Sequence, residues 1–108
     1  MSFTMSAQES VPHRELIQRF NDCAGLAFVI DEPSEFEFYK NATIDLAYES
    51  SNGKILQATV LEQIKVTSNY FSKNYSVEFI NANYATQCGY GETRGFATYY
   101  ANQRKNMQ

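Results

Sequence analysis

Tryptophan is absent from this 108-residue chain, and proline, glycine, cysteine and histidine are all scarce. Two prolines and five glycines are too few for a collagen-like chain or for a disordered chain rich in these residues. No apolar run approaches the ~18 residues that a membrane-spanning helix needs, and no secretory signal pattern opens the sequence. These absences predict a soluble, cytoplasmic protein made of one domain.

The residues that usually carry catalysis or bind metals are equally sparse. His13 is the only histidine, and we expect it to be exposed in the first turn of a helix. Cys23 is predicted to be a buried free thiol on a helix's apolar face, and Cys88 to be exposed in a glycine-punctuated loop; a disulfide between them stays open. Nucleotide-binding, metalloprotease and hydrolase motifs are all missing. We therefore expect no metal, no cofactor and no catalytic residue, and a non-enzymatic function is favoured.

Aromatic residues are plentiful, with eight Phe and eight Tyr, and both types favour β-strands. Between Glu35 and Thr67 the apolar residues fall mainly at even positions, as on one buried face of a pleated ribbon. Two such runs are separated by Ser51-Asn52-Gly53, which predicts a β-hairpin. A three-residue loop that pairs Ser50 with Lys54 keeps both apolar sets on one face, with Gly53 in the left-handed region. The pattern leaves open whether residues 35–49 form one strand or two.

Ahead of this hairpin, the apolar spacing is helical. Ser10 is a suitable N-cap, Pro12 fits the first turn, and Gly25 is expected to end the helix. Its apolar stripe is Leu16, Phe20, Cys23, Ala24 and Ala27. Residues 26–30 fit either a buried strand or the tail of the helix, and we favour the strand. Further strands are expected near residues 75–80 and 93–102.

Together these elements predict an α+β fold, in which one N-terminal amphipathic helix packs on a curved antiparallel β-meander of about five or six strands. We place this single domain at residues 10–103, with a flexible tail at 1–9 and a frayed tail at 104–108. The element order resembles that of cystatin-like folds, in which a curved sheet wraps a helix. The resemblance rests on element order alone and implies no function.

Charge points to a binding surface. The net charge is −3, and six of the twelve acids fall within residues 31–49. On the predicted sheet much of this acidic group shares the solvent face beside an exposed tyrosine, and the proposed partner-binding residues are Asp31, Glu32, Glu35, Glu37, Tyr39, Asp45 and Glu49. Such a face serves solubility alone in one interpretation. In the other it docks a basic protein surface, such as that of a nucleic-acid-binding enzyme or complex, without binding nucleic acid directly.

The favoured function is therefore a protein-binding module or inhibitor of the immunity, counter-defence or chaperone type. The alternative is a small-molecule or enzymatic pocket between helix and sheet. Its lining would include a carboxylate with a raised pKa, and the candidate residues are Phe20, Phe38, Tyr48, Glu62 and Phe79. A homodimer that pairs through an edge strand is a third hypothesis.

Overall fold

The structure, a computed structural model that describes residues 11–106, is all-helical. In chain order its elements are α2 (His13–Val29), α3 (Pro33–Ser50), α4 (Gln57–Asn74), α5 (Val77–Tyr84), the π-helical turn η1 (Ala85–Gly89) and α6 (Glu92–Asn106). Residues 11–106 contain no β-strand, so the predicted α+β fold with its meander, and the likeness to cystatin-like folds, are wrong. The predicted N-terminal tail lies outside the described residues. The backbone of α6 includes residues 104–106, which were predicted to fray.

The N-terminal helix is the element that the sequence predicted best. The stripe of α2 is buried as expected, from Leu16 through Phe20 to Ala27. Gly25 does not end the helix, which runs four residues further, to Val29. Residues 26–29 are thus the tail of the helix and not a strand, because Leu26 and Ala27 continue the same buried stripe.

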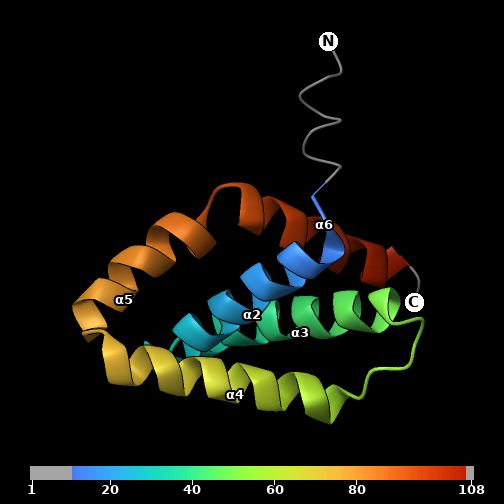
Figure 1. Ribbon diagram of the computed structural model, residues 1–108. Coiled ribbons are helices and arrows are strands. Elements are labelled where there is room, and N and C mark those ends of the chain that lie inside the picture. The colour runs from blue at the N-terminus through green and yellow to red at the C-terminus, as the bar shows by residue number, and fades with distance from the viewer. Residues whose placement is uncertain (1–10, 107–108) are drawn as a thin grey trace.

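Helix α3 replaces the first half of the predicted hairpin. It lies against α2 in an antiparallel pair (Figure 1). Its buried residues are Tyr39, Ala42, Thr43, Leu46 and Ala47. Their spacing of three and four residues is that of a helix, and it was hidden by the even positions of Phe36, Phe38, Ile44 and Tyr48, which are half-buried or exposed. The apolar residues of this segment fit both the two-residue period of a strand and the 3.6-residue period of a helix, and packing against α2 favours the helix.

The turn at Ser51-Asn52-Gly53 is present, but it ends a helix and does not connect strands. Asn52 and Gly53 both have positive φ angles, of 58° and 78°. The Gly53 amide donates to the Tyr48 carbonyl at 2.8 Å, and the Lys54 amide donates to the Ser51 carbonyl at 3.2 Å. These bonds close the last turn of α3, and the predicted pairing of Ser50 with Lys54 in a hairpin is wrong.

Helix α4 packs against α2 (Figure 1). The two helices meet at Gly25 of α2. Its buried residues are Val60, Ile64 and Ser68, which follow one another at intervals of four. A Cβ atom placed on Gly25 would lie 2.8 Å from the Cγ2 atom of Thr67 and 3.2 Å from the backbone nitrogen of Ser68. Gly25 therefore permits the close approach of two helices, which is a different role from the predicted helix stop.

The C-terminal half folds back over the helical pair. Ser76 caps α5, and its hydroxyl accepts a hydrogen bond from the Phe79 amide at 3.1 Å. The chain then passes through η1 and turns at Gly91, whose φ is 96°. Helix α6 returns along α3 and buries Ala97 in the common core (Figure 1). None of the described helices is long and apolar enough to cross a membrane.

Candidate functional site

The sheet that was predicted to carry the acidic face is not formed by residues 11–106. Asp31 and Glu32 lie in the turn between α2 and α3, and the other acids are distributed around α3. A helix rotates successive residues by about 100°, so positions that alternate along a strand point in several directions on a helix. Tyr39, expected on the exposed acidic face, is fully buried, with 0% of its surface exposed.

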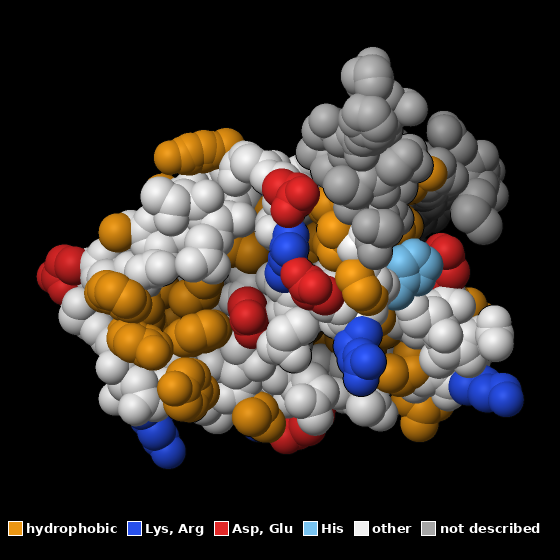
Figure 2. All heavy atoms as spheres, turned by 45° about the horizontal axis from the view of Figure 1, so that its top comes forward, with side chains coloured by type: hydrophobic (Ala, Val, Ile, Leu, Met, Phe, Trp, Pro, Cys, Tyr) orange, Lys and Arg blue, Asp and Glu red, His pale blue; other side chains and the backbone are white. Residues whose placement is uncertain are grey.

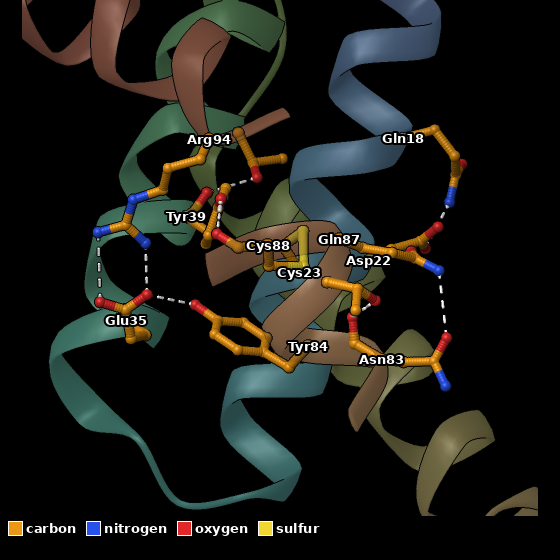
Figure 3. Close-up of a disulfide and its surroundings, with 12 residues drawn as sticks. Gln18, Asp22, Cys23, Glu35, Tyr39, Asn83, Tyr84, Gln87, Cys88 and Arg94 are labelled. Atoms are coloured by element: carbon orange, nitrogen blue, oxygen red, sulfur yellow. Dashed lines mark hydrogen bonds and ion pairs between the residues drawn. A yellow bond between two sulfur atoms is a disulfide. The ribbon is translucent and has the colours of Figure 1, made fainter. Parts of the chain in front are cut away.

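Glu35 takes part in a polar cluster that joins three elements. Arg94 of α6 binds both carboxylate oxygens, with Nη1 on Oε1 and Nη2 3.4 Å from Oε2. The hydroxyl of Tyr84, from α5, donates to Oε1 at 2.5 Å (Figure 3). The hydrogen bond from Arg94 lowers the pKa of Glu35, against an opposing effect of burial. This carboxylate is occupied within the fold, so a docking role for it loses its basis.

The remaining predicted acids are also scattered. Glu37 forms an ion pair of 2.8 Å with Lys40, Asp45 is half-buried, and Glu49 is exposed near the end of α3. Exposed pairs of this kind contribute little to stability. Glu35 and Glu37 are therefore engaged in local contacts within the fold.

The residues of the predicted alternative pocket are not brought together either. Phe20 is buried in the core, and Phe38 lies under the guanidinium of Arg94, whose carbon is 4.3 Å from the ring centroid. Tyr48 is exposed, as is Glu62 on the outer side of α4. Only Phe79 lines the groove described below.

The two cysteines form a disulfide, which corrects both predictions made for them. Cys23 of α2 is buried as expected but is not a free thiol, and Cys88 of η1 is fully buried, not exposed. The Cys88 carbonyl accepts a hydrogen bond of 2.5 Å from the hydroxyl of Tyr39 (Figure 3). The disulfide thus fixes η1 to the centre of the α2–α3 pair across a separation of 65 residues.

The single histidine does not form a catalytic constellation. His13 is an exposed residue in the first turn of α2, as predicted. Its Nδ1 lies 3.2 Å from the Ser50 hydroxyl and its Nε2 lies 3.4 Å from the Tyr100 hydroxyl. Ser50 ends α3, where the negative end of the helix dipole opposes an anionic nucleophile. Within residues 11–106, no group of three or more His, Cys, Asp or Glu side chains is arranged to hold a metal ion.

An aromatic face lies at the corner between α4 and α5, and we define it as Tyr70, Phe71, Tyr75, Val77 and Phe79. Tyr70, Tyr75 and Phe79 expose 55%, 40% and 51% of their surfaces. The rings of Tyr75 and Phe79 are stacked, with centroids 4.9 Å apart, and Tyr70 lies 6.3 Å from Tyr75. Figure 2 shows hydrophobic side chains gathered over this corner, at the left of the view. The rings form one contiguous, water-exposed apolar surface.

A groove of about 180 Å³ runs from this aromatic face toward α2. Phe71, Tyr75 and Phe79 form its apolar wall, and Asp22 and Gln87 are among its polar residues. Burial raises the pKa of Asp22, while a hydrogen bond from Gln18 acts in the opposite direction. In Figure 3, Asp22 lies on the opposite side of the disulfide from Glu35. One partly buried carboxylate therefore lines the same groove as three aromatic rings.

Apart from Phe79, sequence reasoning missed this site, although a signal for it was present. Phe71, Tyr75 and Phe79 are spaced by four residues, which places them side by side across a helical corner. The alternation of Tyr75, Val77 and Phe79 was instead interpreted as a strand. Asp22 lies on α2, and no local pattern in the sequence shows which element packs beside it.

Comparison with known proteins gives no family. No protein-family model matches the chain, and no curated protein or solved structure is similar to it.

Proposed function

We propose that this protein is a non-enzymatic protein-binding domain that docks its partner through the aromatic face at the α4–α5 corner. The observation that carries the proposal is the exposure of three adjacent rings, in which Tyr75 contacts both Tyr70 and Phe79. Contiguous exposed apolar surface is unfavourable in water and is uncommon on proteins that bind nothing. Aromatic residues, tyrosine among them, are enriched at the centres of protein interfaces.

The acidic character of the chain supports a partner with a basic surface. The net charge is −3, and an opposite charge on the partner would raise the rate of association. An inhibitor, an immunity or counter-defence protein and a chaperone all fit this description. The docking surface proposed here differs from the acidic sheet face expected from the sequence, because that face is not formed.

The disulfide indicates the kind of cellular compartment in which the protein works. Cytosolic thiols are kept reduced, and disulfides persist mainly in oxidising environments. The pairing of Cys23 with Cys88 therefore supports a protein that works in an oxidising compartment, in place of the cytoplasmic location expected from the sequence.

The test is retention of a partner by tagged, disulfide-bonded protein from a lysate of the source cells. We expect wild type to retain a partner that a Tyr75→Ser/Phe79→Ser variant loses. A Tyr48→Ser/Tyr99→Ser variant is the matched control, because both residues are as exposed as the rings of the aromatic face but belong to α3 and α6. Circular dichroism and thermal unfolding confirm that each variant is folded.

Two outcomes contradict the proposal. Equal retention by wild type and by Tyr75→Ser/Phe79→Ser would exclude the aromatic face as the docking surface. A wild-type dimer in size-exclusion chromatography that only this variant converts to monomer would show that a second copy covers the face. Charge reversal at Glu35 is unsuitable as a test, because it would break the cluster with Arg94 and Tyr84.

A further inference from the structure

Asp22 is a charged group that the fold does not neutralise. Its Oδ1 accepts a hydrogen bond of 2.9 Å from Gln18, and among the described residues no ion pair joins it to a base. Arg19 lies one turn earlier on the same helix, but it is paired with Glu15 at 2.6 Å and Glu92 at 2.9 Å. Gln18 supplies a neutral donor only, so no positive charge among the described residues pairs with this partly buried carboxylate.

Burial of this carboxylate has a direct consequence for binding. Its pKa is raised because a partly buried carboxylate has lost favourable hydration. A cation that enters the groove restores the missing stabilisation, since an opposite charge favours the ionised form. The site therefore gains more from a cation than an exposed carboxylate does.

The aromatic wall of the groove favours the same kind of ligand. The π-face of an aromatic ring attracts a cation, and planar guanidinium groups also stack on such rings. Phe71, Tyr75 and Phe79 supply these rings within the groove that Asp22 lines. The amide nitrogen of Gln87 already donates to Asn83 at 3.2 Å, which leaves the Gln87 amide oxygen as an acceptor for a bound donor.

We propose that this groove binds an arginine side chain of the partner protein, with the guanidinium paired with Asp22 and the side chain lying along the rings of Tyr75 and Phe79. Arginine fits better than lysine because its planar group pairs with a carboxylate through two parallel bonds, stacks on rings and is weakly hydrated. A basic group also complements the net charge of −3. This inference rests on the proposed function, since it names the group by which the partner is recognised beside the aromatic face.

The experiment is an NMR titration of ¹⁵N-labelled, disulfide-bonded protein with two probes, N-acetyl-arginine amide and N-acetyl-citrulline amide. The probes have nearly the same shape, and only the first carries a positive charge. We expect the arginine probe to shift the amide signals of Asp22, Phe79 and Gln87 and to bind about fivefold to tenfold more tightly than the citrulline probe, as a charge-assisted hydrogen bond predicts.

An Asp22→Asn variant should reduce the affinity for the arginine probe to that for citrulline. This substitution keeps a side-chain oxygen that can accept from Gln18 and removes a desolvated charge, so the fold is retained. A Glu78→Gln variant is the matched control: it removes an exposed carboxylate from the neighbouring α5 and should leave both affinities unchanged.

Equal binding of the two probes, unchanged binding in Asp22→Asn, or no shift at the groove amides would each overturn the inference. The proposed function fails separately. If Tyr75→Ser/Phe79→Ser loses the partner but the two probes bind equally well, the aromatic face is supported as the docking surface and the arginine site is refuted. If the variant retains the partner while the arginine probe binds at Asp22, the groove recognises a cation but does not dock that partner.

Discussion

Two glycines in helices should respond in opposite directions to the same substitution. Gly25 lies in α2 at the crossing with α4, where an added Cβ atom meets Thr67 Cγ2 at 2.8 Å and the Ser68 backbone nitrogen at 3.2 Å. Gly95 lies in α6, where an added Cβ atom meets nothing within 4 Å. Alanine is favoured over glycine in a helix by about 1 kcal/mol at either position. The difference between the two variants therefore isolates the cost of the close helix crossing.

We expect Gly95→Ala to raise the free energy of unfolding by about 0.5–1 kcal/mol. For Gly25→Ala, overpacking costs about 1–3 kcal/mol, and backbone atoms at the crossing cannot rotate away. The propensity gain of about 1 kcal/mol offsets part of this cost, so the net loss is expected to be about 1 kcal/mol and to reach about 2 kcal/mol at most. For a domain of this size the melting temperature should fall by roughly 5–10 °C.

The assay is urea unfolding followed by circular dichroism, supported by calorimetry. A Gly25→Ala/Thr67→Ser double variant tests whether the loss comes from the contact with Thr67. Serine removes the Cγ2 atom and keeps the hydroxyl that accepts from Asn21 at 2.6 Å. The double variant should therefore recover part of the loss, with a coupling energy of about 0.5–1 kcal/mol in the double-mutant cycle. If Gly25→Ala is as stable as Gly95→Ala, or if the cycle shows no coupling, the close crossing of α2 and α4 is refuted.

Three further predictions concern the disulfide and the buried polar cluster. Replacing both Cys23 and Cys88 with alanine should lower the free energy of unfolding by about 4 kcal/mol, because the bond closes a loop across a separation of 65 residues. Urea unfolding measures this loss. Two thiols that react with a thiol reagent in native wild type would contradict the bond. Burial raises the pKa of Tyr39 to about 12, so its contribution to stability is present below pH 10 and is lost as the pH rises toward 12. The pKa of Tyr84 is raised as well, by burial and by its hydrogen bond to Glu35, so tyrosinate absorbance should show more than one late titration. Tyr39→Phe should remove the one near pH 12, and an unchanged titration in this variant would refute the burial of Tyr39. The pKa of Glu35 is lowered from its usual value of 4.5, so wild type should lose stability as the pH falls below this value. In acid unfolding curves Glu35→Gln should lose less stability than wild type. Parallel curves for the two proteins would count against the cluster.

The disulfide also gives the polar cluster its place in the molecule. The Cys88 carbonyl accepts a hydrogen bond from the Tyr39 hydroxyl. One turn earlier, the Tyr84 hydroxyl donates a hydrogen bond to Glu35. Helices α5 and α6 therefore join the α2–α3 pair through a covalent bond, a buried hydroxyl and a charged pair. This fixed base holds the α5 side of the aromatic face in position, which favours binding because a prearranged surface loses less entropy.

The candidate site lies where local pattern carries the least information. Phe71 to Phe79 spans the end of α4 and the start of α5, and its period is consistent with either a strand or a helical corner. Asp22 is distant from these residues in sequence, and only packing places it in their groove. Since exposure at the corner depends on which faces the other helices cover, the sequence could not distinguish core rings from surface rings.

Some features of this protein follow from the sequence by itself. The stripe of Leu16, Phe20 and Ala27 specifies an amphipathic helix, because its spacing suits no other element. Asn52 and Gly53 specify a turn, because both residues tolerate a positive φ angle. The identity of the elements on either side of that turn was decided only by the tertiary structure. Residues 35–49 have apolar positions at both strand and helix periods, and burying Tyr39, Leu46 and their neighbours against α2 stabilises the helical period alone.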